Sequence, residues 1–460
     1  MIPIALNNLA DVLSGRLYGI AQCISSVSTD TRTLQKKGMF IALVGKRLDG
    51  HDYIADAMAR GATVILSEKK VPHPPHVSVL VVADTTKALG ALAGYIKQKV
   101  NPWCFALTGS CGKTTVKEIL GQIMSFQGQV HMTQGNFNNH IGVPLTLLGL
   151  EAHHEYAVLE LGANHQGEID YTSGLIEPDV ALVNNIAPAH LEGFGSIEGI
   201  AEAKSEIYQH IKPNGFAVVN RDDAFADLLS QRSEHCQQIF FSAQEVADVY
   251  ATELQKNAMG CYRFNLNIDE RSEMVQLKLA GRHQVHNALA AAAMAHAQGV
   301  DVSKIAQGIQ LVTGVKGRMQ LHQYANVVLV DDTYNASPKS VEAAIDWLSE
   351  TEGFKWLVLG DLAEMGADTK NWHQHLGTYA LQKNLDQVFT LGQLSAATSA
   401  AFGSNHHHYY ELPPLCNALQ QQLCDSKHVN ILVKGSRGAH MERVVLALEN
   451  MLNQKDNQSC

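Results

Sequence analysis

The sequence of 460 residues has no uncharged apolar stretch long enough to cross a membrane. A spanning helix needs about 20 apolar residues, and the Ala-rich segment 287–300 is shorter and contains His and Gln. The first residues also lack the basic segment that opens a secretory signal peptide. We therefore expect a soluble, cytoplasmic protein with no stable membrane insertion.

Paired cysteines are absent too. The eight cysteines are scattered along the chain, and no two of them form a CxxC pair. In a chain of this length the pattern favours reduced thiols over a disulfide framework or a zinc site. The composition, with 46% hydrophobic and 17% charged residues, excludes a disordered or fibrous protein.

The chain also lacks an excess of basic residues. Its 35 Lys and Arg against 45 Asp and Glu give a net charge of −10, which argues against nucleic acid as a partner because binding to a phosphate backbone needs a basic surface. A local basic pocket for a small phosphorylated ligand remains compatible with this charge. We interpret the run His406-His407-His408 as a solvated surface loop rather than a metal site.

The length predicts about three domains. We place a first domain at 1–84, a central domain at 85–313 and a third domain at 314–460. In the first, short apolar strands are expected at 39–44, 62–66 and 77–82. The proline-rich residues 72–75 should form a loop, since proline removes a donor from the strand ladder. A helix is predicted from about 86 to 99.

The second and third blocks alternate apolar strands with helical patterns. Strands are predicted at 104–107, 157–161, 180–183, 216–219, 327–330, 356–359, 387–391 and 430–433. Helices are predicted at 113–126, 197–211, 338–348, 371–382 and 440–452. Such alternation predicts the α/β class, with parallel sheets covered by helices on both faces. Open sheets bind ligands at the carboxyl ends of their strands, so we expect the third domain to present a site to the central domain.

A phosphate loop lies between a predicted strand and a helix, at Thr108-Gly109-Ser110-Cys111-Gly112-Lys113-Thr114-Thr115. Glycines let the backbone approach phosphate, and the helix start offers free N–H groups. Lys113 would reach the β- and γ-phosphates of a nucleotide, and the Thr114 hydroxyl would bind Mg²⁺. Leu107 stands where the longer Walker pattern has its first glycine, so the match is to the shorter G-x-x-G-K-T-T form.

Three more residues are candidates for chemistry, each with an ordinary alternative. Glu160 ends a predicted parallel strand beside the phosphate loop, where a carboxylate is well placed for Mg²⁺, although it could equally be a capping residue. His190 lies in a loop after the strand 180–183, and a lone loop histidine is more often structural. Lys204 lies on a predicted helix and, taken by itself, would be an ordinary exposed lysine.

Several motifs in order resemble the Mur ligases of peptidoglycan synthesis over nearly the whole chain. They are Ser28-Thr29-Asp30-Thr31-Arg32, Asp49-Gly50-His51, 108–117, Thr133-Gln134-Gly135-Asn136-Phe137-Asn138-Asn139, Leu159-Glu160-Leu161-Gly162, Ala189-His190-Leu191-Glu192, Ala203-Lys204-Ser205-Glu206, Asp331-Asp332-Thr333-Tyr334-Asn335-Ala336 and Lys434-Gly435-Ser436-Arg437-Gly438. The last two favour the branch that adds a dipeptide. The resemblance implies an N-terminal UDP-binding domain, a central ATPase domain and a C-terminal Rossmann-like domain.

The resemblance also implies roles at the nucleotide. Thr114 and Glu160 become ligands of one Mg²⁺, His190 becomes a ligand of a second, and Lys204 matches a lysine that relatives carry as a carbamate. A carbamate would offer oxygen donors to a hard cation. Gly109, Ser110, Cys111, Gly112, Lys113 and Thr115 become ATP-binding residues, together with Asn287, Arg318, Asp332 and Tyr334 of the later motifs.

One departure concerns the usual His-Asn pair of the family, which here reads His283-Gln284. The longer side chain puts a purine contact at Gln284 in doubt, so Asn287 is the preferred candidate. On the substrate side, the resemblance implies that UDP and the attached peptide are bound by Ser28, Arg32, Asp49, Gly50, His51, Asn138 and Asn139. As isolated residues, Ser28, Arg32 and the Asp49-Gly50-His51 turn would more often form turns than bind ligands.

The activity implied by the resemblance is ATP-dependent ligation of D-alanyl-D-alanine to UDP-N-acetylmuramoyl-tripeptide through an acyl phosphate. The resemblance further implies a monomer. Alternatives from the same superfamily would use another acceptor, either a single amino acid or glutamate. An alternative from another class is a phosphate-loop kinase or a nucleotide-binding module without turnover.

Overall fold

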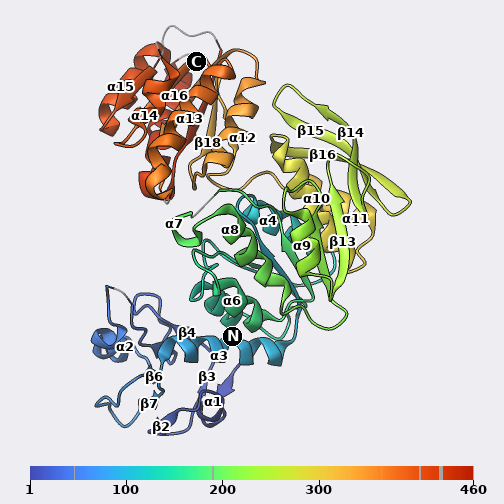
Figure 1. The fold of residues 1–460 in the computed structure, drawn as a ribbon. Helices are drawn as coiled ribbons and strands as arrows, with labels where there is room; N and C mark the ends of the chain where they lie inside the picture. The colour runs from blue at the N-terminus through green and yellow to red at the C-terminus, as the bar shows by residue number, and fades with distance from the viewer. Residues whose placement is uncertain (46, 189–190, 364, 404–405, 424–427, 459–460) are drawn as a thin grey trace.

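The computed structural model describes residues 1–460 except 46, 189–190, 364, 404–405, 424–427 and 459–460. Three α/β units follow one another along the chain, with the N-terminal unit at one end of the molecule and the C-terminal unit at the other (Figure 1). The main sheets of these units contain five, nine and six described strands. The predicted three-domain α/β class is therefore confirmed, while the boundaries at 84/85 and 313/314 stay a prediction.

The N-terminal unit is built on the strand order β2-β7-β6-β5-β4. Its strands are β1 Ile4–Ala5, β2 Arg16–Tyr18, β3 Cys23–Ile24, β4 Val27–Ser28, β5 Met39–Ile41, β6 Val64–Ser67 and β7 Ser78–Val81, and its helices are α1 Leu6–Val12, η1 Gly50–Tyr53 and α2 Ile54–Ala59. Strands β4 to β7 run parallel, and β2 pairs antiparallel with β7. The turns that follow β4 and β5 therefore meet at one edge of the sheet, and they carry Arg32 and His51.

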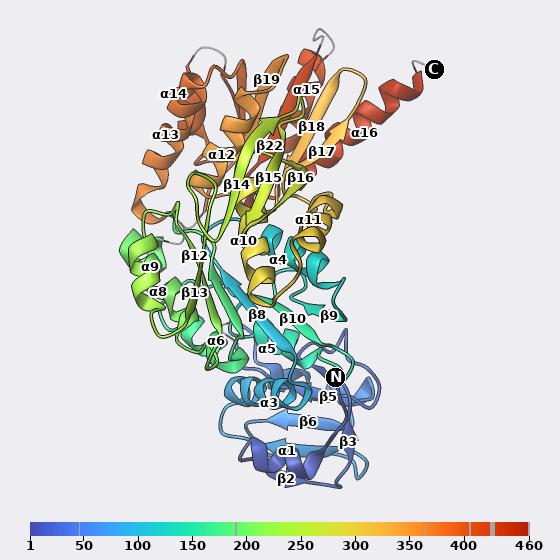
Figure 2. The same cartoon turned by 90° about the vertical axis from the view of Figure 1, so that its right-hand side faces the viewer.

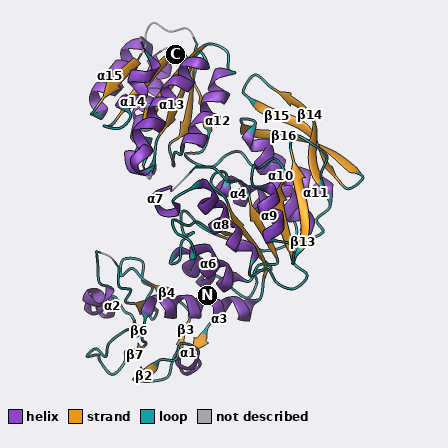
Figure 3. Cartoon of the chain, viewed as in Figure 1, coloured by secondary structure: helices purple, strands orange, loops and turns teal. Residues whose placement is uncertain are grey.

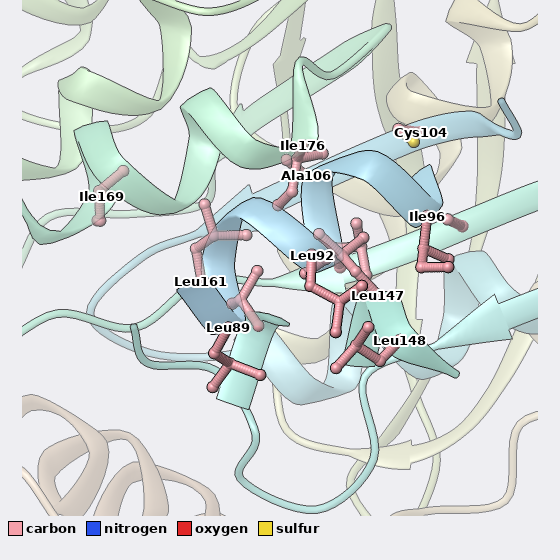
Figure 4. Packing of buried hydrophobic residues seen from close by; sticks show 14 of the residues in the cluster. Leu89, Leu92, Ile96, Cys104, Ala106, Leu147, Leu148, Leu161, Ile169 and Ile176 are labelled. Carbon is pink, nitrogen blue, oxygen red and sulfur yellow. The ribbon is translucent and has the colours of Figure 1, made fainter. Parts of the chain in front are cut away.

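Helix α3 (Thr85–Val100) joins the first two units through one continuous core. The Asp84 carboxylate caps its start by accepting from the backbone N–H groups of Thr86 and Lys87. Figure 4 shows Leu89, Leu92 and Ile96 of α3 packed among residues of the central unit. The same core contains Leu9 and Leu66 of the N-terminal unit, so no solvent layer separates the two units.

The central sheet has the order β16-β15-β14-β13-β12-β11-β8-β10-β9. The strands from β9 to β13 run parallel and are β8 Trp103–Thr108, β9 Val130–Met132, β10 Tyr156–Glu160, β11 Val180–Val183, β12 Phe216–Asn220 and β13 Gln237–Ser242. The covering helices are α4 Lys113–Met124, α5 Gly142–Leu148, α6 Glu168–Ile176, α7 Leu191–Phe194, α8 Ile197–Ser205, η2 Glu206–Tyr208, α9 Ala226–Arg232, α10 His283–Ala297 and α11 Val302–Leu311.

Side chains of β8 alternate between the two faces of this sheet. Cys104 and Ala106 join the core shared with α3, α5 and α6, whereas Phe105 and Leu107 face α4, α10 and α11. Both faces are thus covered by helices, as Figure 3 shows. The strands and helices predicted here are confirmed, with bounds shifted by a few residues.

An antiparallel arm extends this sheet and was not predicted. Strands β14 Val249–Lys256, β15 Cys261–Ile268 and β16 Arg271–Ala280 form it, and β14 pairs parallel with β13. The arm rises from the central sheet toward the C-terminal unit (Figure 2). Its tip contacts helix α12, where the Trp347 indole N–H donates to the Met259 carbonyl at 3.3 Å and Lys256 pairs with Glu350 at 2.9 Å.

The C-terminal sheet has the order β17-β18-β22-β19-β20-β21. Its strands are β17 Gln320–Gln323, β18 Val327–Asp332, β19 Phe354–Gly360, β20 Gln387–Leu391, β21 His406–Tyr409 and β22 Val429–Lys434. Its helices are α12 Pro338–Ser349, η3 Gly366–Asp368, α13 Thr369–Gln382, α14 Ala396–Phe402, α15 Leu412–Leu423, η4 Arg437–Ala439 and α16 Glu442–Gln458. All pairs are parallel except β17 with β18.

The histidine run 406–408 contradicts the loop prediction. It lies within β21, an edge strand that pairs with β20. The Thr390 hydroxyl is 2.9 Å from Nδ1 of His408, and the His407 ring stacks on Phe389. Packing against β20 holds the His407 and His408 side chains, and local composition cannot reveal this contact. Among the described helices, none is long and apolar enough to span a membrane.

Candidate active site

The phosphate loop connects β8 to α4 at the carboxyl end of the central sheet. Gly109 and Gly112 have φ values of +151° and +80°, which residues other than glycine rarely adopt. A Cβ on Gly112 would also lie 2.7 Å from Nδ2 of Asn184. Both glycines are therefore required by the loop's shape and by its close contact with neighbouring segments.

Two asparagines after β11 hold this loop in place. The Cys111 N–H donates to Oδ1 of Asn185 at 2.8 Å, and Nδ2 of Asn184 donates to the Cys111 carbonyl at 2.9 Å. The Ser110 N–H donates to the Asn185 carbonyl. These contacts hold the loop backbone in one conformation, which lowers the entropic cost of binding phosphate.

Lys113 is the first residue of α4 and points back into the loop. Its ammonium donates to the Gly109 carbonyl at 2.7 Å. Burial lowers the pKa of Lys113, while the Glu160 carboxylate opposes this shift. The ammonium is thus held within the loop, and its contact with phosphate stays a prediction.

Glu160 ends β10 beside the start of α4 and is almost fully buried. The Thr114 hydroxyl donates to its Oε2 at 2.8 Å, and the Asn138 amide donates to its Oε1 at 2.9 Å. The guanidinium of Arg318 donates to the Thr114 hydroxyl at 2.8 Å. The Glu160 carboxylate and the Thr114 hydroxyl are hard oxygen donors close together, which fits Mg²⁺, an ion that binds through one or two protein oxygens and substrate phosphates.

Lys204, on α8, is only 2% exposed. Burial, and then the nearby Lys113 ammonium, lower the pKa of Lys204 to about 7. No acidic side chain pairs with it within the described part of the chain. The interpretation of Lys204 as an ordinary exposed lysine is thereby excluded, because its side chain lies inside the central unit.

His190, the predicted ligand of a second metal, lies outside the described residues. Among the residues that are described, no group of three or more His, Cys, Asp or Glu side chains is arranged to hold a metal. The role of His190 therefore stays a prediction.

The C-terminal unit reaches the phosphate loop at two points. Arg318 contacts Thr114, and its guanidinium lies 4.2 Å from the ring centroid of Tyr334. The Cys111 thiol is 3.4 Å from the Ser337 hydroxyl. The third domain thus faces the central one as predicted, and Arg318 and Tyr334 belong to one cluster with the loop.

Asp332 ends β18 directly beside Lys434 at the end of β22. The Lys434 ammonium donates to Oδ2 of Asp332 at 2.6 Å, and the Met319 N–H donates to Oδ1 at 3.1 Å. The predicted ribose-binding carboxylate is thus oriented by an ion pair. Its contact with ribose stays a prediction.

Asn287 lies on α10 against the phosphate loop. Its Oδ1 accepts from Nδ2 of Asn184, and its own Nδ2 donates to Oε1 of Gln284 at 2.9 Å. Asn287 therefore supports Asn184, which holds the loop, and Gln284 orients the Asn287 amide. Gln284, which stands where the family usually has Asn, still offers a side-chain amide to Asn287.

The predicted UDP-binding residues lie in the turns after β4 and β5. The guanidinium of Arg32 is exposed and donates to Asp30, whose pKa it lowers to about 2. The Ser28 hydroxyl donates to the Asp30 carbonyl.

In the turn after β5, Nδ1 of His51 lies 2.6 Å from the Asp49 carboxylate. Its Nε2 accepts from the Glu68 N–H, which fixes the tautomer of the ring. A Cβ on Gly50 would lie 2.7 Å from the Leu43 backbone.

Asn138 and Asn139 have separate places despite being neighbours. Asn138 donates to Glu160, whereas Oδ1 of Asn139 accepts from the N–H groups of Ile141 and Gly142 at the start of α5. Asn139 therefore caps a helix, and Asn138 belongs to the Glu160 cluster. Substrate binding by either one stays a prediction.

Sequence reasoning missed four residues around the site: Lys117, Thr133, Asn184 and Asn185. The signal for the two asparagines was present, since polar residues directly after a buried parallel strand lie at the ligand-binding edge of a sheet. Thr133 and Lys117 lie inside recognised motifs without a role there, and only the packing of α4 against β9 brings them together.

Comparisons with known proteins agree with this geometry. Profiles of the Mur ligase family match residues 23–96 (catalytic domain), 107–295 (middle domain) and 317–437 (glutamate ligase domain). A UDP-N-acetylmuramoyl-tripeptide–D-alanyl-D-alanine ligase of Escherichia coli K12 is 42% identical over 98% of this chain and 99% of that protein.

Two solved structures are similar along almost the whole chain. MurF from Acinetobacter baumannii has a TM-score of 0.93 and 38% identity, covering 97% of this chain and 99% of that one. The MurF ligase from Thermotoga maritima, solved in complex with ADP, has a TM-score of 0.83 and 28% identity, covering 93% and 98%.

A phosphate loop, a buried acid beside it and an arginine from a third domain define an ATP-dependent ligase, and the chain belongs to the Mur ligase family. Within that family it groups with the MurF ligases.

Proposed function

We propose that this protein joins D-alanyl-D-alanine to UDP-N-acetylmuramoyl-tripeptide at the expense of ATP, producing the UDP-muramoyl pentapeptide used for peptidoglycan. Its relatives of nearly full length carry this activity in their names. We further propose that it acts as a monomer in the cytoplasm, where ATP and UDP-sugars are available.

The observation that carries the proposal is that three segments of the chain meet at the Thr114 hydroxyl and the Glu160 carboxylate. Thr114 of the phosphate loop, Glu160 of β10 and Arg318 of the C-terminal unit form an unbroken chain of contacts. Asn138 adds a fourth segment. A hydrolase or a binding module needs no contact from a third domain, whereas a ligase must position two substrates against ATP.

In the reaction, an oxygen of the tripeptide carboxylate attacks the γ-phosphorus of ATP, and the bond to the β-phosphate oxygen breaks to release ADP. The amine of D-alanyl-D-alanine then attacks the acyl phosphate carbon, an amide bond forms, and phosphate and one proton leave. Positioning and charge stabilisation carry both steps. Lys113 and Arg318 would neutralise the phosphate oxygens that gain charge.

Bound Mg²⁺ would supply charge neutralisation and hold the oxygens in line. Thr114 and Glu160 would hold one such ion, and His190 and Lys204 would serve a second. In the N-terminal unit, Ser28, Arg32, Asp49, Gly50 and His51 would hold the UDP moiety. Arg32 is suited to a diphosphate because its planar guanidinium forms paired hydrogen bonds.

Lys204 would act as a carbamate. The neutral amine attacks CO₂, an N–C bond forms and one proton is released, which converts the neutral side chain into an oxygen-donor anion. Support comes from the burial of Lys204 and from a pKa near 7, which keeps much of the amine neutral at pH 7. Its position near the Lys113 ammonium, together with burial, disfavours a second positive charge there.

Isotopic bicarbonate tests this carbamate. In protein equilibrated with ¹³C-bicarbonate, we expect one protein-bound carbamate resonance that is absent from the Lys204→Met variant. The variant should lose ligation and remain folded, which its thermal unfolding checks. A wild-type spectrum without the resonance, or a variant that retains it, would refute the carbamate.

The proposed reaction is tested by phosphate release from ATP and Mg²⁺ with each substrate alone and with both together. We expect release only with both UDP-muramoyl tripeptide and D-alanyl-D-alanine, and a pentapeptide product by mass spectrometry. Release with a single amino acid in place of the dipeptide would assign a sister activity. A stable phosphorylated product, or no phosphate release at all, would exclude a ligase.

A further inference from the structure

Glu160 is held from two directions. Thr114 and Asn138 fix its carboxylate, and its backbone N–H donates to the Thr133 hydroxyl at 3.0 Å. Thr133 follows β9 and is 1% exposed. The side chain of Thr133 thus sets the position of the strand end from which the Glu160 carboxylate extends.

Thr133 is itself held by a buried lysine. The Lys117 ammonium donates to the Thr133 carbonyl at 2.6 Å and pairs with Glu118 at 2.9 Å. The Thr133 N–H donates to the Val158 carbonyl of β10. With both its backbone groups bonded, the backbone of Thr133 is held beside the Glu160 N–H, from which the Thr133 hydroxyl accepts.

Lys117 and Thr114 lie on the same face of α4, because residues three apart on a helix are neighbours. Thr114 contacts the Glu160 carboxylate directly, and Lys117 contacts the same strand end through Thr133. The helix that carries the phosphate loop is therefore joined to the strand that carries the acid at two successive turns.

We propose that Thr133 and Lys117 are positioning residues for the metal ligand Glu160. Mg²⁺ demands near-ideal octahedral geometry, so a small shift of one carboxylate weakens binding. Groups that orient a ligand typically account for about 10–100-fold in metal affinity or activity. Burying the Lys117 ammonium costs free energy, and fixing Thr133 gives this cation a role that an apolar residue could not fill.

The decisive measurement is Mn²⁺ affinity by electron paramagnetic resonance, in the presence of a non-hydrolysable ATP analogue. Thr133→Val keeps the shape of the side chain and removes the hydroxyl, and it should weaken Mn²⁺ binding about 10–100-fold. Thr133→Ser retains the hydroxyl and should restore affinity to within about 3-fold. Lys117→Met should weaken binding in the same direction, even if Thr133→Val fails to fold.

Thr172→Val provides the matched control, since Thr172 is a fully buried threonine on α6 whose hydroxyl donates to Glu168 and Ile169 carbonyls. Its Mn²⁺ affinity should equal that of the wild type. Wild-type affinity in folded Thr133→Val or in Lys117→Met would overturn the proposal. An equal loss in Thr172→Val would also overturn it, since any buried hydroxyl would then have the same effect.

This inference rests on the proposed role of Glu160 as a metal ligand, so Glu160→Gln belongs in the same titration. A loss of affinity in Glu160→Gln without a loss in Thr133→Val would refute only the positioning role. Unchanged affinity in Glu160→Gln would refute the ligand assignment itself, and the positioning role with it.

Discussion

We expect Lys113→Ala to abolish ligation, with kcat/KM lower by at least about 10²–10³-fold. The Lys113 ammonium lies inside the phosphate loop, 2.7 Å from the Gly109 carbonyl, and no other lysine of the described loop segment 108–115 could replace it. Without it, the charge that develops on the transferred phosphoryl group loses its nearest cation. Burial already lowers the pKa of Lys113, so removing this cation should not destabilise the fold.

The measurement is product formation by mass spectrometry together with thermal unfolding. Lys113→Met, which keeps most of the side-chain length, serves as a companion variant. Binding of the UDP-muramoyl substrate should be unchanged in both, since the residues proposed for UDP lie in the N-terminal unit. Near-normal ligation by either folded variant would contradict the proposed mechanism.

Glu160→Ala should also eliminate turnover, for a different reason. The carboxylate accepts hydrogen bonds from Thr114 and Asn138 and is the acidic member of the proposed metal site. Its loss removes a charged ligand and leaves the buried Thr114 hydroxyl and the half-buried Asn138 amide without their acceptor. An unsatisfied buried donor such as the Thr114 hydroxyl costs about 1–3 kcal/mol. We therefore expect a lower unfolding temperature as well as lost activity.

Activity measured over a range of Mg²⁺ concentrations separates the two effects. Glu160→Gln keeps an oxygen acceptor and should retain more stability than Glu160→Ala, but it should still need far more Mg²⁺ for any turnover. Lys113→Ala should show no such shift in the Mg²⁺ requirement. If excess Mg²⁺ left Glu160→Gln as active as the wild type at ordinary Mg²⁺, the carboxylate charge would be dispensable.

The sequence predicted the parallel parts of the fold well. Each buried strand is a continuous apolar run that ends at a polar or glycine residue, so β8, β10, β11 and β12 could be located to within one or two residues. The arm formed by β14, β15 and β16 was missed because half of its side chains face solvent. Alternation of buried and exposed residues along β15 was the available signal.

The site was predicted in its residues but not in its contacts. Glycine and lysine spacing identified the phosphate loop, because its chemistry is local. The pair Asp332–Lys434 joins positions 102 residues apart and depends on β22 lying beside β18, an order that no local pattern encodes. Tertiary packing also decides burial where the local sequence pattern suggests exposure. Lys204 is an example, because its helix looks amphipathic and yet the lysine is buried.

The core shared across α3 bears on how the chain is made. Residues of the N-terminal unit, such as Leu9 and Leu66, pack in one cluster with residues as late as Leu229. During synthesis the first segment therefore leaves the ribosome before many of its packing partners exist. We expect it to complete its core only after α3 and the helices packed on it, α5 and α6, have emerged. Strands β18 to β22 contribute to separate cores and can fold afterwards. A truncation after residue 84 would leave an apolar surface uncovered.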